Sequence, residues 1–276
     1  MKNRIMKLST VAVFTMALAI TPFAAVGAVS LSGCDFDDSV AGTWTLQADC
    51  TSTAQINIPV NTTLDGDGYT ISPNFARTNN SNNSVLGVIG ADNVTIKDLT
   101  IDGVGGTNLH GVNVYVAENV VLENVTSTDN DRSGVVVNGS NVTVEDITTA
   151  GNGWHGINVA QGGGVTDPAV LTVNGQSSQT DAWQIYLDDT TQNVTVNDVE
   201  SQYLVSYPVT TPDRPNDKLY TLKQIVTDKA QCKANGWQNV YAANFDGFKN
   251  QGQCVAYVSS SPMSALHKII FAALAI

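Results

Sequence analysis

The chain has 276 residues, and its formal net charge is −12 because 25 acidic residues outnumber 13 basic ones. This composition excludes nucleic acid as a partner, since phosphate binding needs clustered Lys and Arg, and residues 85–201 contain only Lys97 and Arg132. A polyanionic glycan would also be repelled unless a bound cation bridged it, and Ca²⁺ is the cofactor we would expect in such a bridge. No other cofactor and no metal-ligand set is indicated.

Residues 1–28 have the features of a secretory signal peptide. Basic residues at the start precede an apolar run, Val11–Ile20, and Ala25–Ala28 offers small residues for cleavage. Because the apolar run is short for a bilayer span, we favour a cleaved signal over a membrane anchor. The chain is therefore expected to be secreted, or attached to the cell surface.

The chain has 4 cysteines, which form two local pairs on either side of a cysteine-free middle. In an exported chain this arrangement predicts two disulfides, Cys34 with Cys50 and Cys232 with Cys254. Neither pair has the CxxC spacing of a structural zinc site.

Residues 29–75 are predicted to form an N-terminal cap and the first strands of a solenoid, because an uncovered first coil would expose strand edges to other chains. Trp44 and Leu46 are expected to cover that coil. Asp65 and Asp67, in the segment LDGDGYTI, could ligate calcium, although a Gly-Asp turn is the commoner explanation.

Residues 76–207 contain a repeat, which we expect to form the coils. Segments that begin with Asn-Val or a related start recur at steps of 22 to 26 residues around one irregular unit. In each, alternating apolar residues are interrupted once by a polar pair, which predicts two strands joined by a bend. The segments are Asn93–Ile101, Asn119–Ser127, Asn141–Thr149, Val170–Ser178 and Asn193–Ser201.

These units resemble the right-handed parallel β-helix repeats of the pectate-lyase-like superfamily, over about residues 60–203. The resemblance implies an all-β, single-stranded parallel β-helix (a solenoid) in which inward Val and Ile side chains stack coil on coil. It is less informative about activity, because that superfamily includes lyases, glycoside hydrolases, epimerases, tailspike-like and adhesive proteins.

A second repeated series departs from the aliphatic pattern and supplies the candidate site. Its first positions align as a column: Leu86, His110, Ser133, His155 and Trp183. Carboxylates, imidazole and guanidinium groups are used in glycan cleavage, and Trp faces stack on sugar rings. The candidate catalytic residues are Asp129, Asp131, Arg132 and His155, and the candidate substrate-binding residues are His110, Trp154 and Trp183.

The same polar residues have a structural explanation, because turns of a solenoid collect polar side chains. Asp129 and Asp131 would then terminate a turn, and Arg132 would form a surface ion pair with one of them. Polygalacturonase-like hydrolases carry grouped aspartates, a GHG element and an Arg-x-Lys element. In this chain, DND (129–131) partly resembles the grouped aspartates, and WHG (154–156) and LHG (109–111) resemble the GHG element. The Arg-x-Lys element is missing.

A mostly Thr outward column is also predicted, as in ice-binding solenoids, although strand propensity alone explains Thr at such positions. Its members are Thr95, Val121, Thr143, Thr172 and Thr195.

The C-terminal part is predicted to contain a Pro-rich linker (208–217), a compact module (218–258) and an apolar tail (259–276). The module resembles a short cysteine-paired motif found at the C-termini of secreted bacterial proteins. Trp237, Phe245 and Phe248 are expected to pack around its disulfide.

The sequence as a whole favours a protein that recognises extracellular polysaccharide or another cell-surface component. A polysaccharide hydrolase or lyase is the main alternative, and a structural or adhesive protein is the third.

Overall fold

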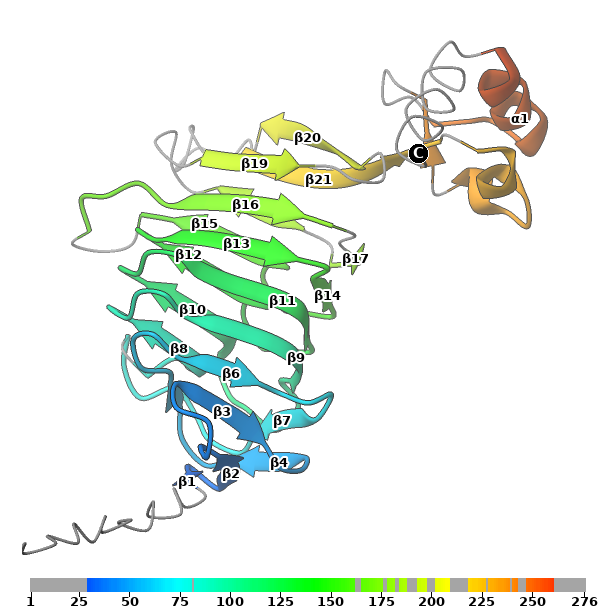
Figure 1. Ribbon diagram of the computed structural model, residues 1–276. Coiled ribbons are helices and arrows are strands. Elements are labelled where there is room, and N and C mark those ends of the chain that lie inside the picture. Colours follow the sequence, from blue (N-terminus) through cyan, green and yellow to red (C-terminus); the bar gives the residue numbers. More distant parts are fainter. Residues whose placement is uncertain are drawn as a thin grey trace, which may run out of the picture.

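The computed structural model describes residues 29–80, 82–161, 165–175, 178–181, 184–187, 193–197, 202–208, 218–226, 228–238, 240–242 and 247–260. The predicted signal peptide and the last 16 residues (261–276) lie outside this part, as do Trp183 and Phe245. In the described part, strands stack in sequence order along one axis, from the blue N-terminal end to the yellow strands (Figure 1). No helix in these residues is long and apolar enough to cross a membrane.

The first long sheet has 13 strands and pairs β3, β6, β9, β11, β13, β16 and β19 in that order. Every pair from β3 to β19 is parallel, and each strand lies beside its counterpart in the next repeat. The bounds are β3 (Thr43–Leu46), β6 (Thr63–Asp65), β9 (Thr95–Asp102), β11 (Val120–Thr128), β13 (Asn141–Glu145), β16 (Val170–Asn174) and β19 (Asn193–Asn197).

The second long sheet has 9 strands and is parallel from β5 to β18. Because the chain alternates between the two sheets, each repeat makes one coil of a solenoid. The bounds are β5 (Ile56–Asn57), β8 (Ser84–Ile89), β10 (His110–Tyr115), β12 (Val135–Asn138), β15 (Ile157–Ala160) and β18 (Ile185–Leu187).

A bend divides the longest strands and creates a third wall. Asp98, Asn124 and Asp146 have φ of 50°, 50° and 53°, the left-handed conformation that Asn and Asp tolerate best. These are polar positions at which the sequence predicts the bend, and the prediction is confirmed. Beyond the bend, the ends of β9 and β11 pair with short strands. The short strands are β4 (Cys50–Ser52), β7 (Thr70–Pro73), β14 (Thr148–Ala150) and β17 (Ser178–Gln179).

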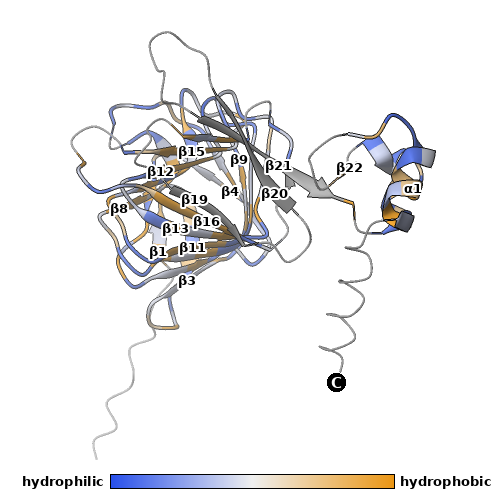
Figure 2. Ribbon diagram, turned by 90° about the horizontal axis from the view of Figure 1, so that it is seen from above, coloured by the Kyte–Doolittle hydropathy of each residue, from blue (hydrophilic) through white to orange (hydrophobic). Residues whose placement is uncertain are grey.

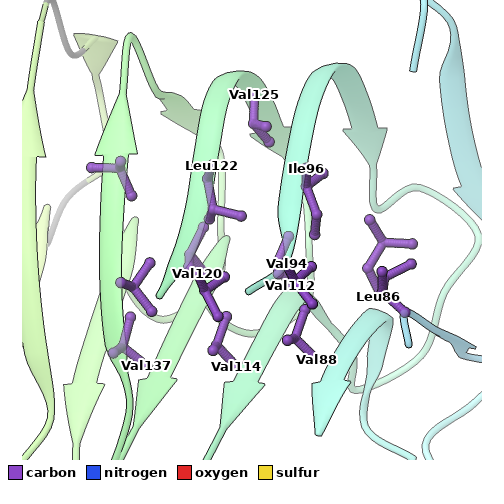
Figure 3. Close-up of a cluster of buried hydrophobic side chains, with 14 of the residues drawn as sticks. Leu86, Val88, Val94, Ile96, Val112, Val114, Val120, Leu122, Val125 and Val137 are labelled. Carbon is purple, nitrogen blue, oxygen red and sulfur yellow. The ribbon is translucent and has the colours of Figure 1, made fainter. Parts of the chain in front are cut away.

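The core is a set of aliphatic ladders that run along the solenoid axis. Leu122 lies beside Ile96 in one neighbouring coil and Val144 in the other, and all three are fully buried. Val112 of the opposite sheet lies beside Leu86 and Val135 in the same way. The side chains of the two sheets meet between the walls (Figure 3). Seen from above, apolar colours concentrate on the strands and polar colours on the surrounding turns (Figure 2).

An asparagine ladder joins three turns of successive coils. Asn61, Asn93 and Asn119 have φ of 56°, 57° and 58°. The Nδ2 of Asn93 donates to Oδ1 of Asn61 at 2.9 Å, and the Nδ2 of Asn119 donates to Oδ1 of Asn93 at 3.1 Å. The side chains thus bridge turns whose backbone only Gly, Asn or Asp adopts readily.

The ladder leads to a prediction. Asn93→Ala should lower the free energy of unfolding by about 1–3 kcal/mol, since it removes two side-chain bonds and places Ala in the left-handed region. Asn93→Gly should cost less, because Gly keeps the backbone conformation. Asn141→Ala is the matched control, since Asn141 begins another NVT segment in extended backbone. Denaturant unfolding measures all three, and equal losses at Asn93 and Asn141 would contradict a role for the ladder.

The N-terminal end is closed as predicted. The antiparallel strands β1 (Val29–Leu31), β2 (Cys34–Asp37) and β3 cover the first coil, and Cys34 is bonded to Cys50. Leu46 is buried and Trp44 packs against the core with its ring centroid 5.9 Å from that of Phe36. Parallel pairing already begins between β3 and β6, so the coils start earlier than the predicted boundary at residue 76.

The C-terminal end is arranged differently from the predicted linker and module. The strands β20 (Gln202–Pro208) and β21 (Lys218–Ile225) pair antiparallel, and β21 also pairs antiparallel with β18. The segment predicted as a linker therefore connects two paired strands. Since β21 adds to the second sheet, it closes the solenoid sheet instead of beginning a separate module.

A second, smaller core follows β21 and includes the disulfide between Cys232 and Cys254. Phe248 is buried in it and Trp237 packs against it, which confirms the predicted aromatic packing for the described residues. In Figure 1, helix α1 lies to one side of the stacked coils. The elements are η1 (Lys229–Cys232), η2 (Gly236–Gln238), β22 (Val240–Tyr241) and α1 (Gln251–Ser260).

The predicted outward Thr column exists and is longer than expected. Register places Thr63 and Thr43 in line with Thr95, and all five predicted members follow in order. Two positions further along the same strands, the outward column holds Asp65, Lys97, Glu123 and Glu145. The Thr column is thus one line on a charged face and not a uniform hydroxyl surface.

Candidate functional site

One edge of the solenoid carries a three-residue stack. The guanidinium carbon of Arg132 lies 3.9 Å from the centroid of the Trp154 ring, a cation–π contact. The ring of His110 meets that of Trp154 edge to face, with centroids 5.7 Å apart and planes at 85°. Trp154 remains 44% exposed, whereas His110 is 5% exposed. Three of the predicted site residues are therefore in contact, with the tryptophan outermost.

Backbone hydrogen bonds between coils hold this stack in place. The N–H of Arg132 donates to the carbonyl of Leu109 at 3.0 Å, and the N–H of Trp154 donates to the carbonyl of Arg132 at 3.2 Å. His110 begins β10, while Arg132 and Trp154 lie in the turns that lead into β12 and β15. Equivalent turn positions thus fall one above another, which brings residues 22 or 23 apart in sequence together.

His110 is held neutral by its surroundings. Burial, together with the charges of Arg132, Arg77 and His155, lowers the pKa of His110 from 6.5 to about 3. Its Nδ1 accepts the N–H of Ser133 at 3.1 Å, which leaves the proton of the neutral ring on Nε2. At neutral pH the imidazole is therefore a hydrogen-bond donor through Nε2 and not a cation.

His155 belongs to a neighbouring cluster. Its ring stacks on Tyr186 with centroids 4.3 Å apart and planes at 7°. Its Nδ1 lies 3.5 Å from Oγ of Ser133 and 3.3 Å from Nδ2 of Asn158. Tyr186 pairs in register with Asn158, so His155 lies along the outer face of the second sheet.

The two candidate carboxylates, of Asp129 and Asp131, contact the backbone of neighbouring turns. Oδ2 of Asp131 accepts the backbone N–H of Asn108 at 2.7 Å. Asp129 has φ of 52°, and its carboxylate lies against Gly151, where an added Cβ would be 2.3 Å from Oδ1. Within the described residues Arg132 makes no ion pair with a carboxylate, so the ion pair expected for it is not found there.

Arg77 is a further residue to consider, and it is not among the site residues predicted from the sequence. Burial, followed by the charge of Arg77, lowers the pKa of Arg132, and the charge of Arg77 also lowers the pKa of His110, after burial and Arg132. The guanidinium of Arg77 donates to the carbonyl of Asn79 at 3.3 Å and to Oδ1 of Asn80. The backbone of Arg77 is tied to Thr107 by an N–H to carbonyl bond of 3.0 Å. Its rarity as a basic residue could have drawn attention to it. Residues 29–217 of the sequence contain four Lys or Arg residues, which are Arg77, Lys97, Arg132 and Arg214.

The predicted column also needs a correction at its first member. Ser84 pairs with His110, and Leu86 pairs with Val112, so the alignment of Leu86 with His110 was wrong by two residues. The sequence pattern does not reveal this shift, because moving a strand by two residues keeps every side chain on the same face of the sheet.

The calcium expectation at the LDGDGYTI turn gains no support from its geometry. Asp65 forms an ion pair of 2.6 Å with Lys97 and accepts the N–H of Asp67 at 3.0 Å. Both oxygens are thus engaged by the protein. Among the described residues, no group of three or more His, Cys, Asp or Glu side chains is placed to hold a metal ion.

Comparison with known proteins agrees with the geometry. Residues 84–200 match the family model described as a right-handed beta helix region. The protein is a right-handed parallel β-helix with a disulfide at each end. Searches among curated proteins and among solved structures found no match. The two disulfides are typical of an extracellular or otherwise oxidising environment.

Proposed function

We propose that the protein binds an extracellular carbohydrate at the edge formed by Arg77, His110, Arg132 and Trp154, without cleaving it. The observation that carries this proposal is the exposed Trp154, fixed by Arg132 and His110. Single exposed apolar residues are common on protein surfaces. Trp154 differs because two other side chains, those of Arg132 and His110, contact its ring and hold it in one orientation. A rigid ring offers contact area at little cost in conformational entropy, and its apolar surface suits the C–H face of a sugar.

Polar groups around the Trp154 ring would orient a bound sugar through hydrogen bonds. The guanidinium of Arg132 offers donors that suit sugar hydroxyl and ring oxygens. The guanidinium of Arg77 donates to the carbonyl of Asn79 and to Oδ1 of Asn80, and His110 is buried, so we assign these two residues a supporting role. Arg132 covers part of Trp154, so the proposed contact uses the exposed part of the ring. Two cations on one edge also make this edge differ from the rest of a chain with net charge −12.

The contacts of the two candidate carboxylates favour binding without cleavage over a hydrolase or lyase. Glycoside hydrolysis needs two carboxyl groups that face one bond, one of them as an acid. Here Asp131 accepts a backbone N–H and Asp129 packs against Gly151. His155 stacks on Tyr186 and lies beside Ser133 and Asn158. The catalytic alternative would require these side chains to leave such contacts.

The test is a glycan array probed with the purified protein, followed by product analysis on every glycan that binds. The proposal predicts binding with no new reducing ends and no unsaturated products. Release of either product in proportion to enzyme would instead establish the hydrolase or lyase alternative. Absence of binding to any glycan would favour a structural role for the coils.

A further inference from the structure

A polar corner lies inside the solenoid, where the third wall meets the second sheet. Ser127, Thr149 and Gln179 occupy one register column of the third wall and point inward. In the coil of Ser127, Oγ of Ser127 and Nδ2 of Asn130 have protein partners, while Oδ1 of Asn130 has none among the described residues. The hydroxyl of Ser127 donates to the carbonyl of Gly134 at 2.9 Å, and Nδ2 of Asn130 donates to Oγ of Ser127 at 3.1 Å.

In the next coils, several such groups have no protein partner in the part of the chain that the structure describes. They are Oγ1 of Thr149, both amide atoms of Gln179 and Oδ2 of Asp181. The residues are 0%, 8% and 7% exposed, respectively. A buried polar atom without a partner is costly, and a buried carboxylate more so, which makes a cluster of them a sign of a bound species.

Two of these oxygens, Oγ1 of Thr149 and Oδ2 of Asp181, lie beside Gly156. A Cβ added to this glycine would lie 2.4 Å from Oγ1 of Thr149, 2.8 Å from Oδ2 of Asp181 and 2.8 Å from the backbone oxygen of Gln184. A side chain at this position would collide with these oxygens, so glycine is required and the small space beside it is bounded by oxygen atoms. Oxygens from three segments of the chain surround this space, and one of them carries a negative charge.

We propose that this corner binds one monovalent metal cation, Na⁺ or K⁺. Carboxylate, hydroxyl, amide and backbone oxygens are the ligands that hard cations take. The donor set carries a single negative charge, so a monovalent ion makes the buried site neutral. A divalent ion would leave a positive charge buried without a partner, which is unfavourable. Water alone would satisfy hydrogen bonds but would leave the carboxylate charge uncompensated.

The ion would stabilise the coil that carries the exposed tryptophan. Oδ1 of Asp181 accepts the N–H of Asn152 at 2.7 Å, and Oδ1 of Asn152 accepts the N–H of Asn130 at 3.1 Å. Asn152 and Gly156 lie on either side of Trp154 in one turn. This site is independent of the proposed glycan binding, since none of its ligands belongs to that edge.

The experiment measures the thermal unfolding midpoint of the full chain in choline chloride, NaCl, KCl and CaCl₂ at matched ionic strength. The proposal predicts a saturable rise of several degrees in NaCl or KCl over choline chloride. Asp181→Asn should lose this ion-specific rise. Asp131→Asn, which removes a carboxylate from an exposed turn, should keep it. Crystals soaked in thallium(I) should show one anomalous peak beside Asp181.

Equal midpoints in choline, sodium and potassium salts would overturn the proposal, as would a rise that Asp181→Asn retains. A rise in CaCl₂ alone would overturn the monovalent assignment, and electron density for water only would do the same. If Asp181→Asn fails to fold, Thr149→Val removes one ligand at constant charge and nearly constant shape. It should then raise the salt concentration of the half-maximal effect about tenfold, and an unchanged concentration would count against the site.

Discussion

Leu122→Ala should lower the free energy of unfolding by about 2–5 kcal/mol, the usual cost of truncating a buried Leu. Leu122 is fully buried between Ile96 and Val144 of the neighbouring coils, so the cavity would interrupt a ladder on both sides. Equivalent coils above and below are already packed with side chains, which limits collapse into the space.

The matched control is the adjacent residue. Val121→Thr changes an outward position whose register neighbours, Thr95 and Thr143, are both Thr. Its expected effect is within about 0.5 kcal/mol, as for other surface substitutions. Denaturant unfolding followed by circular dichroism measures both variants. A loss at Val121 as large as that at Leu122 would contradict the assigned inward and outward faces.

Lowering the pH from 7 to 5 should cost the wild-type protein about 2 kcal/mol of stability through His110 alone. The folded-state pKa of about 3 lies below the unfolded value of 6.5, so the unfolded chain binds the extra proton between these values. Stability is therefore lost as the pH falls below 6.5, by about 1.4 kcal/mol per unit, until the pH approaches 3. At pH 5 most carboxylates are still ionised, which isolates the imidazole.

His110→Asn should remove this dependence, because Oδ1 of Asn is placed to accept the Ser133 N–H in place of Nδ1 and does not titrate. His155→Asn is the control and should keep most of the loss, since the buried imidazole of His110 remains. Unfolding free energies at pH 7, 6 and 5 decide the matter. A wild-type slope that persists in His110→Asn would show that another group is responsible.

The fold was predictable because the same pattern of apolar and bend residues recurs in every repeat. Inward Val and Ile at fixed spacing, together with Asp98, Asn124 and Asp146 at the bends, define strands and turns before any coordinates are known. Both disulfides were predictable too, since each joins cysteines that are close in sequence. Local patterns of this kind repeat from coil to coil and so reinforce one another.

The site was predictable only in part. The sequence predicts that His110, Arg132 and Trp154 share an edge, because the repeat step aligns them. It does not predict that Arg132 contacts Trp154 instead of a carboxylate, since both arrangements fit the same alignment. Arg77 was missed because it lies in a loop outside the repeat, where no period places it relative to the coils.

We propose that the exposed tryptophan edge binds a glycan without cleaving it. Calorimetric titration with a glycan selected by the array tests this most directly, for wild type, Trp154→Ala and Lys97→Gln, whose lysine lies on another face in an ion pair with Asp65. We expect a loss of affinity of at least tenfold for Trp154→Ala, no loss for Lys97→Gln, and an intact glycan after each titration. Wild-type affinity in Trp154→Ala, or cleavage of the glycan during titration, would contradict binding at this edge without cleavage.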